Sequence, residues 1–370
     1  MKKICFFIVI TFLSINTCKA ENLADAKSSI IMNYDTKEII YKDNEMEKLP
    51  PASMTKMMTL LLVMEKIDDK SIKLDDDVTI SSNASSMGGS QVYLNSGEVY
   101  KVEELLKSLA IASANDAAVA LAEFTYGSVD NFVDKMNEKA KELGLINTFF
   151  KNPHGLDEEG HYSCSYDMAL IARELLTHKD ILKYTSTYED YLQKKDGSSL
   201  WLVNTNKLVR FYNGVDGLKT GYTESALYCL TATAKKDNTR FITVIMGSPS
   251  SEKRNNDTKN MLDYAFNNYK TITKISKDTS LTKIKVLNSE KEEYDVYLKD
   301  DYKVLVKKNT KENELNYNIK LNDVKNSFKK EDNIGILQID DKELPLVVHE
   351  DINKISFIKL FIKTLKMVTV

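Results

Sequence analysis

The sequence predicts a mixed helix-and-sheet domain followed by a smaller all-β domain, and three observations support this organisation. Residues 29–41 alternate apolar and polar side chains around a short polar turn, which is typical of a β-hairpin. Residues 50–67 begin with two prolines and continue as a nearly unbroken apolar run, which indicates a helix buried on almost all sides. Beyond residue 269 the composition shifts abruptly to Lys, Glu, Asn and Asp with short β-rich runs. A chain of 370 residues can bury one large core and a second, smaller one.

The remaining elements follow from the period of the apolar residues and from turn signals. In the first domain we expect helices over 102–124, 129–143 and 261–269, and adjacent antiparallel strands over 227–233 and 241–246. In the second domain we expect strands over 283–287, 294–298, 302–306, 315–321 and 334–339. No group of reactive residues stands out in the second domain, so we expect it to be a spacer or docking module.

The first twenty residues have the three parts of a secretory leader: lysines after Met1, an apolar run over 4–15, and a small residue at Ala20. We expect cleavage after Ala20, which makes 1–20 a signal peptide and 21–272 the first mature domain. An uncleaved anchor is the alternative, but the apolar run is short for the roughly 20 residues that span a bilayer. A lipoprotein modified at Cys18 is a weaker alternative.

Residues 351–370, which follow the second domain at 273–350, have the pattern of a basic amphipathic helix. The apolar residues at helical spacing are Ile358, Phe361, Ile362, Leu365 and Val368, and the separate basic stripe is Lys359, Lys363 and Lys366. Such a helix suits the headgroup region of an anionic membrane. A helix packed on its own protein is the alternative. Together with the leader, the tail predicts a secreted protein held at the outer face of the cytoplasmic membrane.

Composition excludes several classes of function. Without the leader's Lys2, Lys3 and Lys19, the 51 basic residues become 48 against 54 acidic ones, a net charge of −6 that argues against nucleic acid as the partner. The four histidines are scattered and no cluster has metal-ligand spacing, so we expect no metal. Cys164 and Cys229 could form one disulfide, which a core of this size does not need.

A candidate nucleophile lies at the start of the buried helix, in Ser53-Met54-Thr55-Lys56. Ser53 and Lys56 are one helical turn apart, so their side chains meet on one face. Lysine can act as the base that a serine needs if burial and neighbouring charge lower its pKa. The helix N-terminus adds N–H groups where an oxyanion would form.

This spacing alone is weak evidence, because Ser-x-x-Lys also begins at Ser250, Ser280, Ser327 and Ser356. The motifs that follow Ser53 distinguish it from the other four. Ser113-Ala114-Asn115 follows 60 residues later, and Lys219-Thr220-Gly221 a further 106 residues on. In this order the three motifs resemble those of the penicillin-recognising serine enzymes.

Within that group the chain resembles the low-molecular-weight penicillin-binding proteins of the D-alanyl-D-alanine carboxypeptidase type. The matching stretches are 51–56, 111–118, 152–157, 166–169 and 215–223. The resemblance implies a serine β-lactamase/transpeptidase-like α/β domain, with an antiparallel sheet between helical layers, followed by the small β-domain and the amphipathic anchor. It also implies that no cofactor is needed.

The resemblance implies a role for each motif residue. Ser53 would be the nucleophile, Lys56 its base, and Ser113 the relay that carries the proton to the leaving amine. The substrate-binding residues would be Asn115 for a peptide group, Lys219 and Thr220 for the terminal carboxylate, Gly221 for close approach, and the N–H groups of Ser53 and Tyr222 for the oxyanion.

Six further positions need separate interpretation. Arg254 aligns with a family arginine near the carboxylate pocket, but its neighbours are charged and surface-like, so a solvated charge is an equal alternative. Many family members have His at the position of Tyr222 and Gly at that of Ala114, which puts substrate preference and deacylation rate in doubt. His154 is interpreted as a residue that supports the site and not as a base, and Asp157 and Asp167 likewise.

The expected reaction is removal of the terminal D-alanine from peptidoglycan stem peptides, and β-lactams are expected to acylate Ser53. A β-lactamase of class A would need a Glu-x-x-x-Asn motif, and no Glu between Ser113 and Lys219 has Asn four residues on. A D,D-endopeptidase would use the same residues in a more open cleft. A penicillin-binding sensor without turnover is the remaining alternative.

Overall fold

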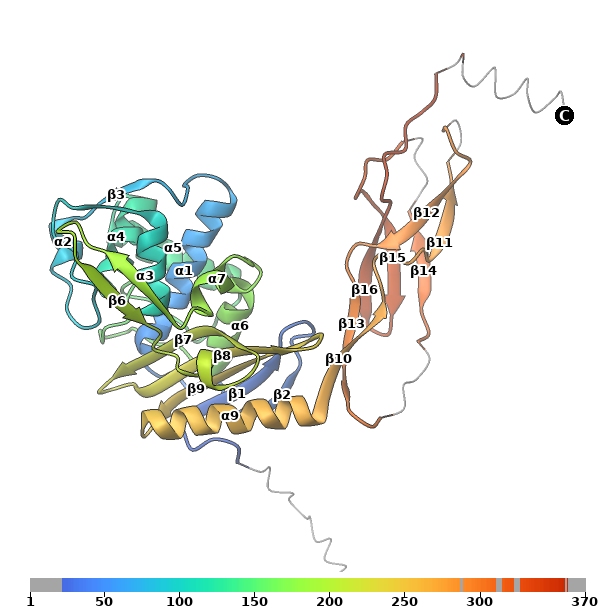
Figure 1. Cartoon of the computed structure of the whole chain (residues 1–370). Coiled ribbons are helices and arrows are strands. Elements are labelled where there is room, and N and C mark those ends of the chain that lie inside the picture. Colours follow the sequence, from blue (N-terminus) through green and yellow to red (C-terminus); the bar gives the residue numbers. More distant parts are fainter. Residues whose placement is uncertain (1–21, 287–288, 311–314, 323–326, 357, 359–370) are drawn as a thin grey trace, which may run out of the picture.

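The computed structural model describes residues 22–286, 289–310, 315–322, 327–356 and 358. Figure 1 shows an N-terminal domain of helices and sheet and a separate C-terminal domain of strands. The predicted leader at 1–20, and residues 357 and 359–370 of the predicted C-terminal helix, lie outside the described residues. No helix in the described part of the chain combines the length and apolar character that a membrane span requires.

A five-stranded antiparallel sheet forms the centre of the N-terminal domain, in the order β2-β1-β9-β8-β7. Its strands are β1 (Ser28–Asn33), β2 (Ile39–Asp43), β7 (Val215–Thr223), β8 (Leu227–Lys236) and β9 (Thr239–Ser248). The predicted hairpin is confirmed as β1 and β2, and the predicted strand pair as β8 and β9. Strand β7 lies at the edge of the sheet, where one side of its backbone pairs with no strand in the described part of the chain.

Helices cover both faces of this sheet (Figure 1). The main ones are α1 (Lys56–Asp68), α5 (Val129–Glu142), α6 (Ser165–Leu175) and α9 (Ser251–Asn268), with shorter η1 (Ala52–Thr55), α2 (Ser82–Ser85), α7 (Ile181–Thr185) and α8 (Leu208–Phe211). Ile31 and Ile245 pack with Met261 of α9 on one face. Their strand neighbours Ile30 and Val244 point to the other face and join the large core around α1 and α6. The predicted fold, a sheet between helical layers, is confirmed.

The prediction of a single helix over 102–124 is wrong. The structure has two helices, α3 (Val102–Ile111) and α4 (Asn115–Tyr126). Between them Ser113 adopts a left-handed conformation, with φ of 63°. The backbone N–H of Asn115 donates to the carbonyl of Ser90, 2.7 Å away, in place of a helical partner. The apolar pattern continues through both helices, so the sequence alone does not reveal the break.

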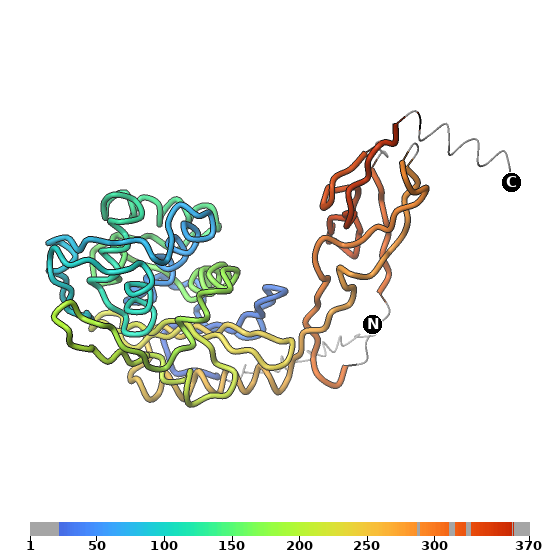
Figure 2. The backbone as a smooth tube through the Cα atoms, turned by 45° about the horizontal axis from the view of Figure 1, so that its top comes forward, coloured from blue at the N-terminus to red at the C-terminus, as the bar shows by residue number. Residues whose placement is uncertain are grey.

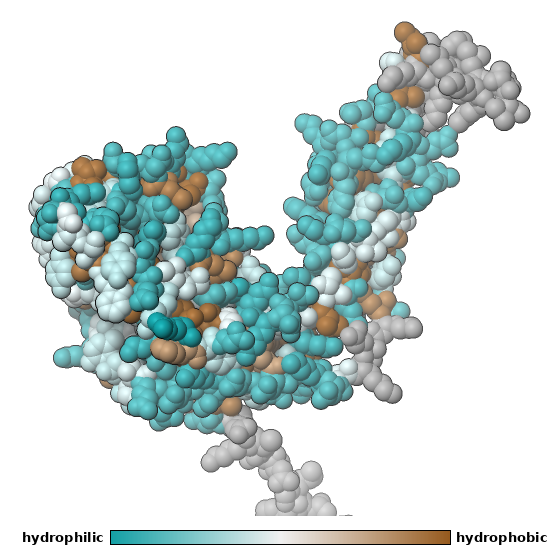
Figure 3. Space-filling model, in the orientation of Figure 1, coloured by the Kyte–Doolittle hydropathy of each residue, from teal (hydrophilic) through white to brown (hydrophobic). Residues whose placement is uncertain are grey.

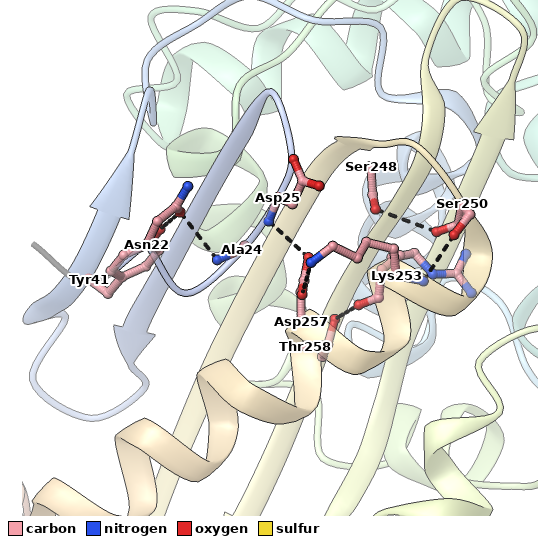
Figure 4. A network of polar contacts seen from close by, with 10 residues as sticks. Asn22, Ala24, Asp25, Tyr41, Ser248, Ser250, Lys253, Asp257 and Thr258 are labelled. Atoms are coloured by element: carbon pink, nitrogen blue, oxygen red, sulfur yellow. Dashed lines mark hydrogen bonds and ion pairs between the residues drawn. The ribbon is translucent and has the colours of Figure 1, made fainter.

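The helix predicted over 261–269 begins ten residues earlier than expected. Ser250 caps α9, because its Oγ accepts the N–H of Lys253 at 3.1 Å. Figure 4 shows Lys253 paired with Asp257 at 2.9 Å, and Asp257 also accepting the N–H of Asp25 from the start of the described chain. The first turns of α9 are therefore polar, and its apolar period is visible only in its second half.

The C-terminal domain is all-β, as predicted. Its strands are β10 (Tyr269–Ile275), β11 (Thr282–Lys285), β12 (Glu293–Leu298), β13 (Tyr302–Lys307), β14 (Asn318–Leu321), β15 (Asn333–Ile339) and β16 (Lys342–Val347). The prediction missed β10 and β16, and the boundary predicted after residue 272 falls inside β10, which continues directly from α9. Figure 2 shows this domain extending away from the end of α9, and a 2.8 Å ion pair between Lys303 and Asp35 joins the two domains.

Candidate active site

Ser53 lies in the turn η1 that leads into α1, and two glycines allow neighbouring segments to contact this turn. A Cβ on Gly155 would lie 1.9 Å from the carbonyl oxygen of Ala52, and a Cβ on Gly221 would lie 3.2 Å from the Ser53 nitrogen. The first contact is made by the loop that follows α5, and the second by edge strand β7. Ser53 is therefore held between a loop and the edge of the sheet.

Lys56 is fully buried, and its Nζ contacts three oxygens. They are Ser53 Oγ at 2.9 Å, Asn115 Oδ1 at 2.6 Å and the carbonyl oxygen of His154 at 2.6 Å. Burial, and then the charge of Lys219, hold the Lys56 pKa well below its ordinary value, and the charge of Asp116 opposes this only partly. A neutral amine has two hydrogens and one lone pair. Asn115 and His154 can accept the two hydrogens, which leaves the lone pair directed at the Ser53 hydroxyl.

The second motif lies between α3 and α4. Ser113 is buried in the break between these helices. Asn115 begins α4, and its Nδ2 donates to the carbonyl of Gly88 at 2.7 Å while its Oδ1 accepts from Lys56. One amide hydrogen of Asn115 is left for a substrate, so its predicted contact with a peptide group is compatible with this geometry.

A loop over residues 88–94, which the sequence analysis missed, holds the second motif in place. The buried Asp116 carboxylate accepts the N–H groups of Val92 at 3.0 Å and Leu94 at 3.1 Å, and burial raises its pKa. A Cβ on Gly89 would lie 2.9 Å from Asn115 Nδ2, so only glycine lets the loop come this close. The Gly88-Gly89 pair was the signal in the sequence that could have indicated this loop.

The third motif lies on β7, and its lysine is close enough to Lys56 to influence it by charge. Lys219 is buried, and burial and then the charge of Arg254 lower its pKa to about 7. The Thr220 hydroxyl donates to Thr205 Oγ1 at 2.7 Å. Neither Lys219 nor Arg254 forms a salt bridge with any described residue. Two buried cations without a carboxylate partner suit the binding of an anionic group.

The alternative of a solvated Arg254 is wrong. This side chain is only 6% exposed, because α9 packs its first turns against β8. Its Nη1 donates to the carbonyl of Cys229 at 3.4 Å and its Nη2 to Asn255 Oδ1 at 2.9 Å. Burial lowers its pKa to about 10. The charged neighbours that made this stretch look solvent-exposed lie on the outer side of the helix.

Tyr222 follows Gly221 on β7 and is exposed, at 53%. Its ring lies over that of Tyr228, with centroids 4.5 Å apart. The next residue, Thr223, donates to Asp157 Oδ1 at 2.9 Å, which ties the end of β7 to the loop carrying Gly155. The aromatic pair therefore lies at the exposed end of β7 and β8, directly after Gly221.

The loop histidine contacts the site through its backbone. The carbonyl of His154 accepts from Lys56, and its Nδ1 accepts the N–H of Leu156 at 3.2 Å. Burial and the Lys56 charge lower its pKa to about 4. His161, which the sequence analysis left unassigned, contacts Thr55 Oγ1 through Nε2 at 2.8 Å. Asp167 accepts from Thr148, outside the site.

Cys164 and Cys229 are free and buried, so the disulfide between them that the sequence left open does not form. Among the described residues no group of His, Cys, Asp and Glu could hold a metal ion. The candidate site itself contains a serine, two lysines, an arginine and neutral polar groups, which is a set suited to acyl transfer.

A family model described as D-alanyl-D-alanine carboxypeptidase matches residues 15–250. The chain belongs to this family. A second model, the C-terminal domain of penicillin-binding protein 5, matches residues 269–354. Membership makes the chain a hydrolase of the serine peptidase type and confirms the resemblance of its motifs.

Individual relatives are similar to this chain in sequence or structure over two thirds of its length or more. It is 46% identical to D-alanyl-D-alanine carboxypeptidase DacF of Bacillus subtilis over 92% of this chain and 89% of that protein. Penicillin binding protein 5 from Haemophilus influenzae superposes with a TM-score of 0.72 at 30% identity, over 89% of this chain and 97% of that one. Penicillin-Binding Protein D2 from Listeria monocytogenes, solved in an ampicillin-bound form, superposes with a TM-score of 0.60 at 29% identity, over 67% and 100% of the two chains.

A first prediction tests the contact between Gly155 and Ala52. Gly155→Ala is expected to lower the free energy of unfolding by about 3 kcal/mol or more, because the new methyl would overlap a backbone oxygen at a residue of positive φ. Gly127 has a similar φ of +81° with open space around it, so Gly127→Ala is the matched control, with an expected loss of about 1 kcal/mol. Urea unfolding measures both values, and equal losses would contradict the proposed contact.

Proposed function

We propose that this chain is a serine-type D-Ala-D-Ala carboxypeptidase that removes the terminal D-alanine of peptidoglycan pentapeptide stems through an acyl-enzyme on Ser53. The contact that supports this most directly is the one between Lys56 Nζ and Ser53 Oγ, 2.9 Å long and buried. A lysine with a lowered pKa can accept the hydroxyl proton near neutral pH.

In the acylation step, Ser53 Oγ attacks the carbonyl carbon between the two D-alanines while its proton moves to Lys56. The N–H groups of Ser53 and Tyr222 stabilise the oxyanion of the tetrahedral intermediate. The C–N bond then breaks, and Ser113 passes a proton from Lys56 to the leaving amine. Free D-alanine leaves, and the shortened stem stays attached to Ser53 as an ester.

In the deacylation step, water attacks the ester carbonyl, Lys56 accepts its proton, and Ser53 is released as the leaving alcohol. The peptide product is one residue shorter than the substrate. β-Lactams enter the same first step, because their strained amide resembles the dipeptide, and their acyl-enzymes are expected to hydrolyse slowly. The ampicillin-bound form of the Listeria protein supports this.

Binding of the terminal carboxylate is assigned to the β7 edge and α9. Lys219 and Arg254 supply positive charge and Thr220 supplies a hydroxyl. Asn115 would bind a peptide group, and Gly221 allows the substrate backbone to lie along β7 as an added strand. The absence of described salt-bridge partners for both cations supports this assignment.

The test is D-alanine release from a synthetic peptide ending in Lys-D-Ala-D-Ala, together with the mass shift of the protein on incubation with penicillin. Release and adduct together are the expected result. An adduct without release would favour a sensor or a strict endopeptidase. Neither release nor adduct from folded protein would overturn the acyl-enzyme proposal.

A second prediction concerns pH. Lys219 is charged below its pKa of about 7 and neutral above it. Affinity of the peptide for the Ser53→Ala variant, measured by calorimetry, is therefore expected to fall about tenfold between about pH 6 and pH 8. Arginine stays charged in this range, so a Lys219→Arg double variant should show a flat profile. A constant affinity with Lys219 present would contradict the assigned role.

Location is also part of the proposal. Residues 1–20 would direct secretion, and the two mature domains would follow. The bounds predicted for the C-terminal helix are too wide, because Ile352 is buried in the β-domain and pairs with Phe328. The part of that predicted helix beyond residue 356 would lie on the anionic outer surface of the cytoplasmic membrane. In Figure 1 the C-terminal domain extends from α9 away from the N-terminal domain. That arrangement supports a spacer that separates the site from the membrane.

A further inference from the structure

A small hairpin beside the site presents two exposed aromatic rings. Strands β5 (Glu189–Gln193) and β6 (Ser199–Val203) pair so that Tyr191 lies directly opposite Trp201. These side chains are 58% and 56% exposed, whereas their strand neighbours Leu192 and Leu202 are buried. Strand alternation therefore turns the leucines to the core and both aromatic rings to solvent.

Neutral polar groups lie next to these rings on the same face of the hairpin. Gln193 and Ser199 are the next outward-facing pair, and their side chains form a 2.8 Å hydrogen bond. Flat aromatic faces pack well against the C–H groups of a sugar ring, while amide and hydroxyl groups bond its hydroxyls. In Figure 3, residues of intermediate hydropathy gather on the left of the N-terminal domain, the side where Figure 1 shows β6. This face suits a neutral carbohydrate better than an anionic polymer.

The hairpin is joined to the active site at its C-terminal end. Thr205, just after β6, accepts the hydrogen bond of Thr220 at 2.7 Å, and its N–H donates to the carbonyl of Ile111 at 3.2 Å. Trp201 is four residues before Thr205, so the two lie at most about 13 Å apart along extended chain. An extended pentapeptide stem spans about 17 Å. A glycan strand whose stem reaches Ser53 therefore lies within reach of the hairpin.

Hydrogen bonds near the turn of the hairpin also fix its position, so the two aromatic rings are held in place without a ligand. Lys194 Nζ donates to the carbonyls of Val92, at 3.1 Å, and Tyr93. At the other end of the hairpin, Asp190 forms a 3.2 Å ion pair with Lys107. Binding to an ordered surface loses less conformational entropy than binding to a mobile one.

We propose that Tyr191 and Trp201 form a carbohydrate-binding surface that holds the glycan strand of peptidoglycan next to the cleft. The inference rests on the proposed function, because the polymer that carries the stem peptide is the ligand. Tyrosine and tryptophan also suit a membrane interface. The direct bonds between the hairpin and the β7 edge favour the glycan, since they connect this face with the substrate site.

Trp201 is the only tryptophan of the chain, so its fluorescence reports on this surface directly. Titration of the mature protein with tetramers of N-acetylglucosamine is expected to change the emission saturably. Tyr191→Ala should weaken this binding about tenfold. Phe211→Ala is the control, because Phe211 is equally exposed but lies outside the hairpin, and it should leave binding unchanged. No change of emission with the sugar, or a change only with vesicles of anionic lipid, would overturn the proposal.

A kinetic comparison separates this inference from the carboxypeptidase assignment. The ratio of KM on a sugar-free pentapeptide to KM on the same peptide linked to a disaccharide should fall about tenfold in Tyr191→Ala and stay constant in Phe211→Ala. An unchanged ratio in Tyr191→Ala, with D-alanine still released, would refute the glycan surface alone. Failure to release D-alanine from either substrate would refute the proposed activity, and the fluorescence titration would still test the surface.

Discussion

Ser53→Ala is expected to reduce D-alanine release to background, a fall of about a millionfold in kcat, because the variant has no group that can form the acyl-enzyme. The change removes one oxygen and leaves the buried helix α1 intact, so thermal unfolding should shift little. Release from a Lys-D-Ala-D-Ala peptide and mass spectrometry after penicillin treatment both measure the loss of acylation, one with the substrate and one with the inhibitor.

The matched control is Ser250→Ala. Ser250 also begins a Ser-x-x-Lys sequence, but its Oγ caps α9 by accepting the N–H of Lys253. Its loss should lower the free energy of unfolding by about 1 kcal/mol and leave the penicillin adduct unaffected. An adduct that persists in Ser53→Ala, or disappears in Ser250→Ala, would refute the choice of nucleophile.

Lys56→Met is expected to slow acylation by penicillin about a thousandfold or more, since it removes the proton acceptor of Ser53 while nearly preserving side-chain volume. Stopped-flow measurement of acylation follows this step without deacylation. In the unmodified chain the rate should fall as acid protonates Lys56, whose pKa is held below its ordinary value mainly by burial. The variant should lose this pH dependence together with the rate.

Lys66→Met supplies the comparison for this variant. Lys66 lies on the same helix but near its C-terminal end, where its side chain is partly exposed and close to Asp69. Its replacement should leave the acylation rate within about twofold, as expected for a surface pair that contributes little. A Lys56→Met enzyme that acylates at a rate close to that of Lys66→Met would exclude Lys56 as the base.

Local sequence determined which residues can take part in acyl transfer and in which order they occur along the chain. The spacing of Ser53 and Lys56 puts them on one helical face whatever surrounds them, because three residues make almost one turn. Successive side chains of a strand point to opposite faces of the sheet, so the sequences of β1, β8 and β9 set which of their side chains point to each face. The change to Lys, Glu, Asn and Asp after residue 269 likewise marked where a separate all-β domain begins.

The order of the motifs distinguished Ser53 from the other Ser-x-x-Lys sequences, but only the tertiary structure shows why this serine and lysine can react. A lysine loses its proton readily only when it is desolvated, and desolvation of Lys56 requires Asn115, His154 and Lys219 to close around it from three distant parts of the chain. The same applies to Arg254, whose neighbours in sequence are charged but whose neighbours in space bury it. The break around Ser113 follows from a bond to Ser90 that no helical period encodes. Burial and long-range hydrogen bonds are properties of the folded chain, and they give the motif residues their reactivity.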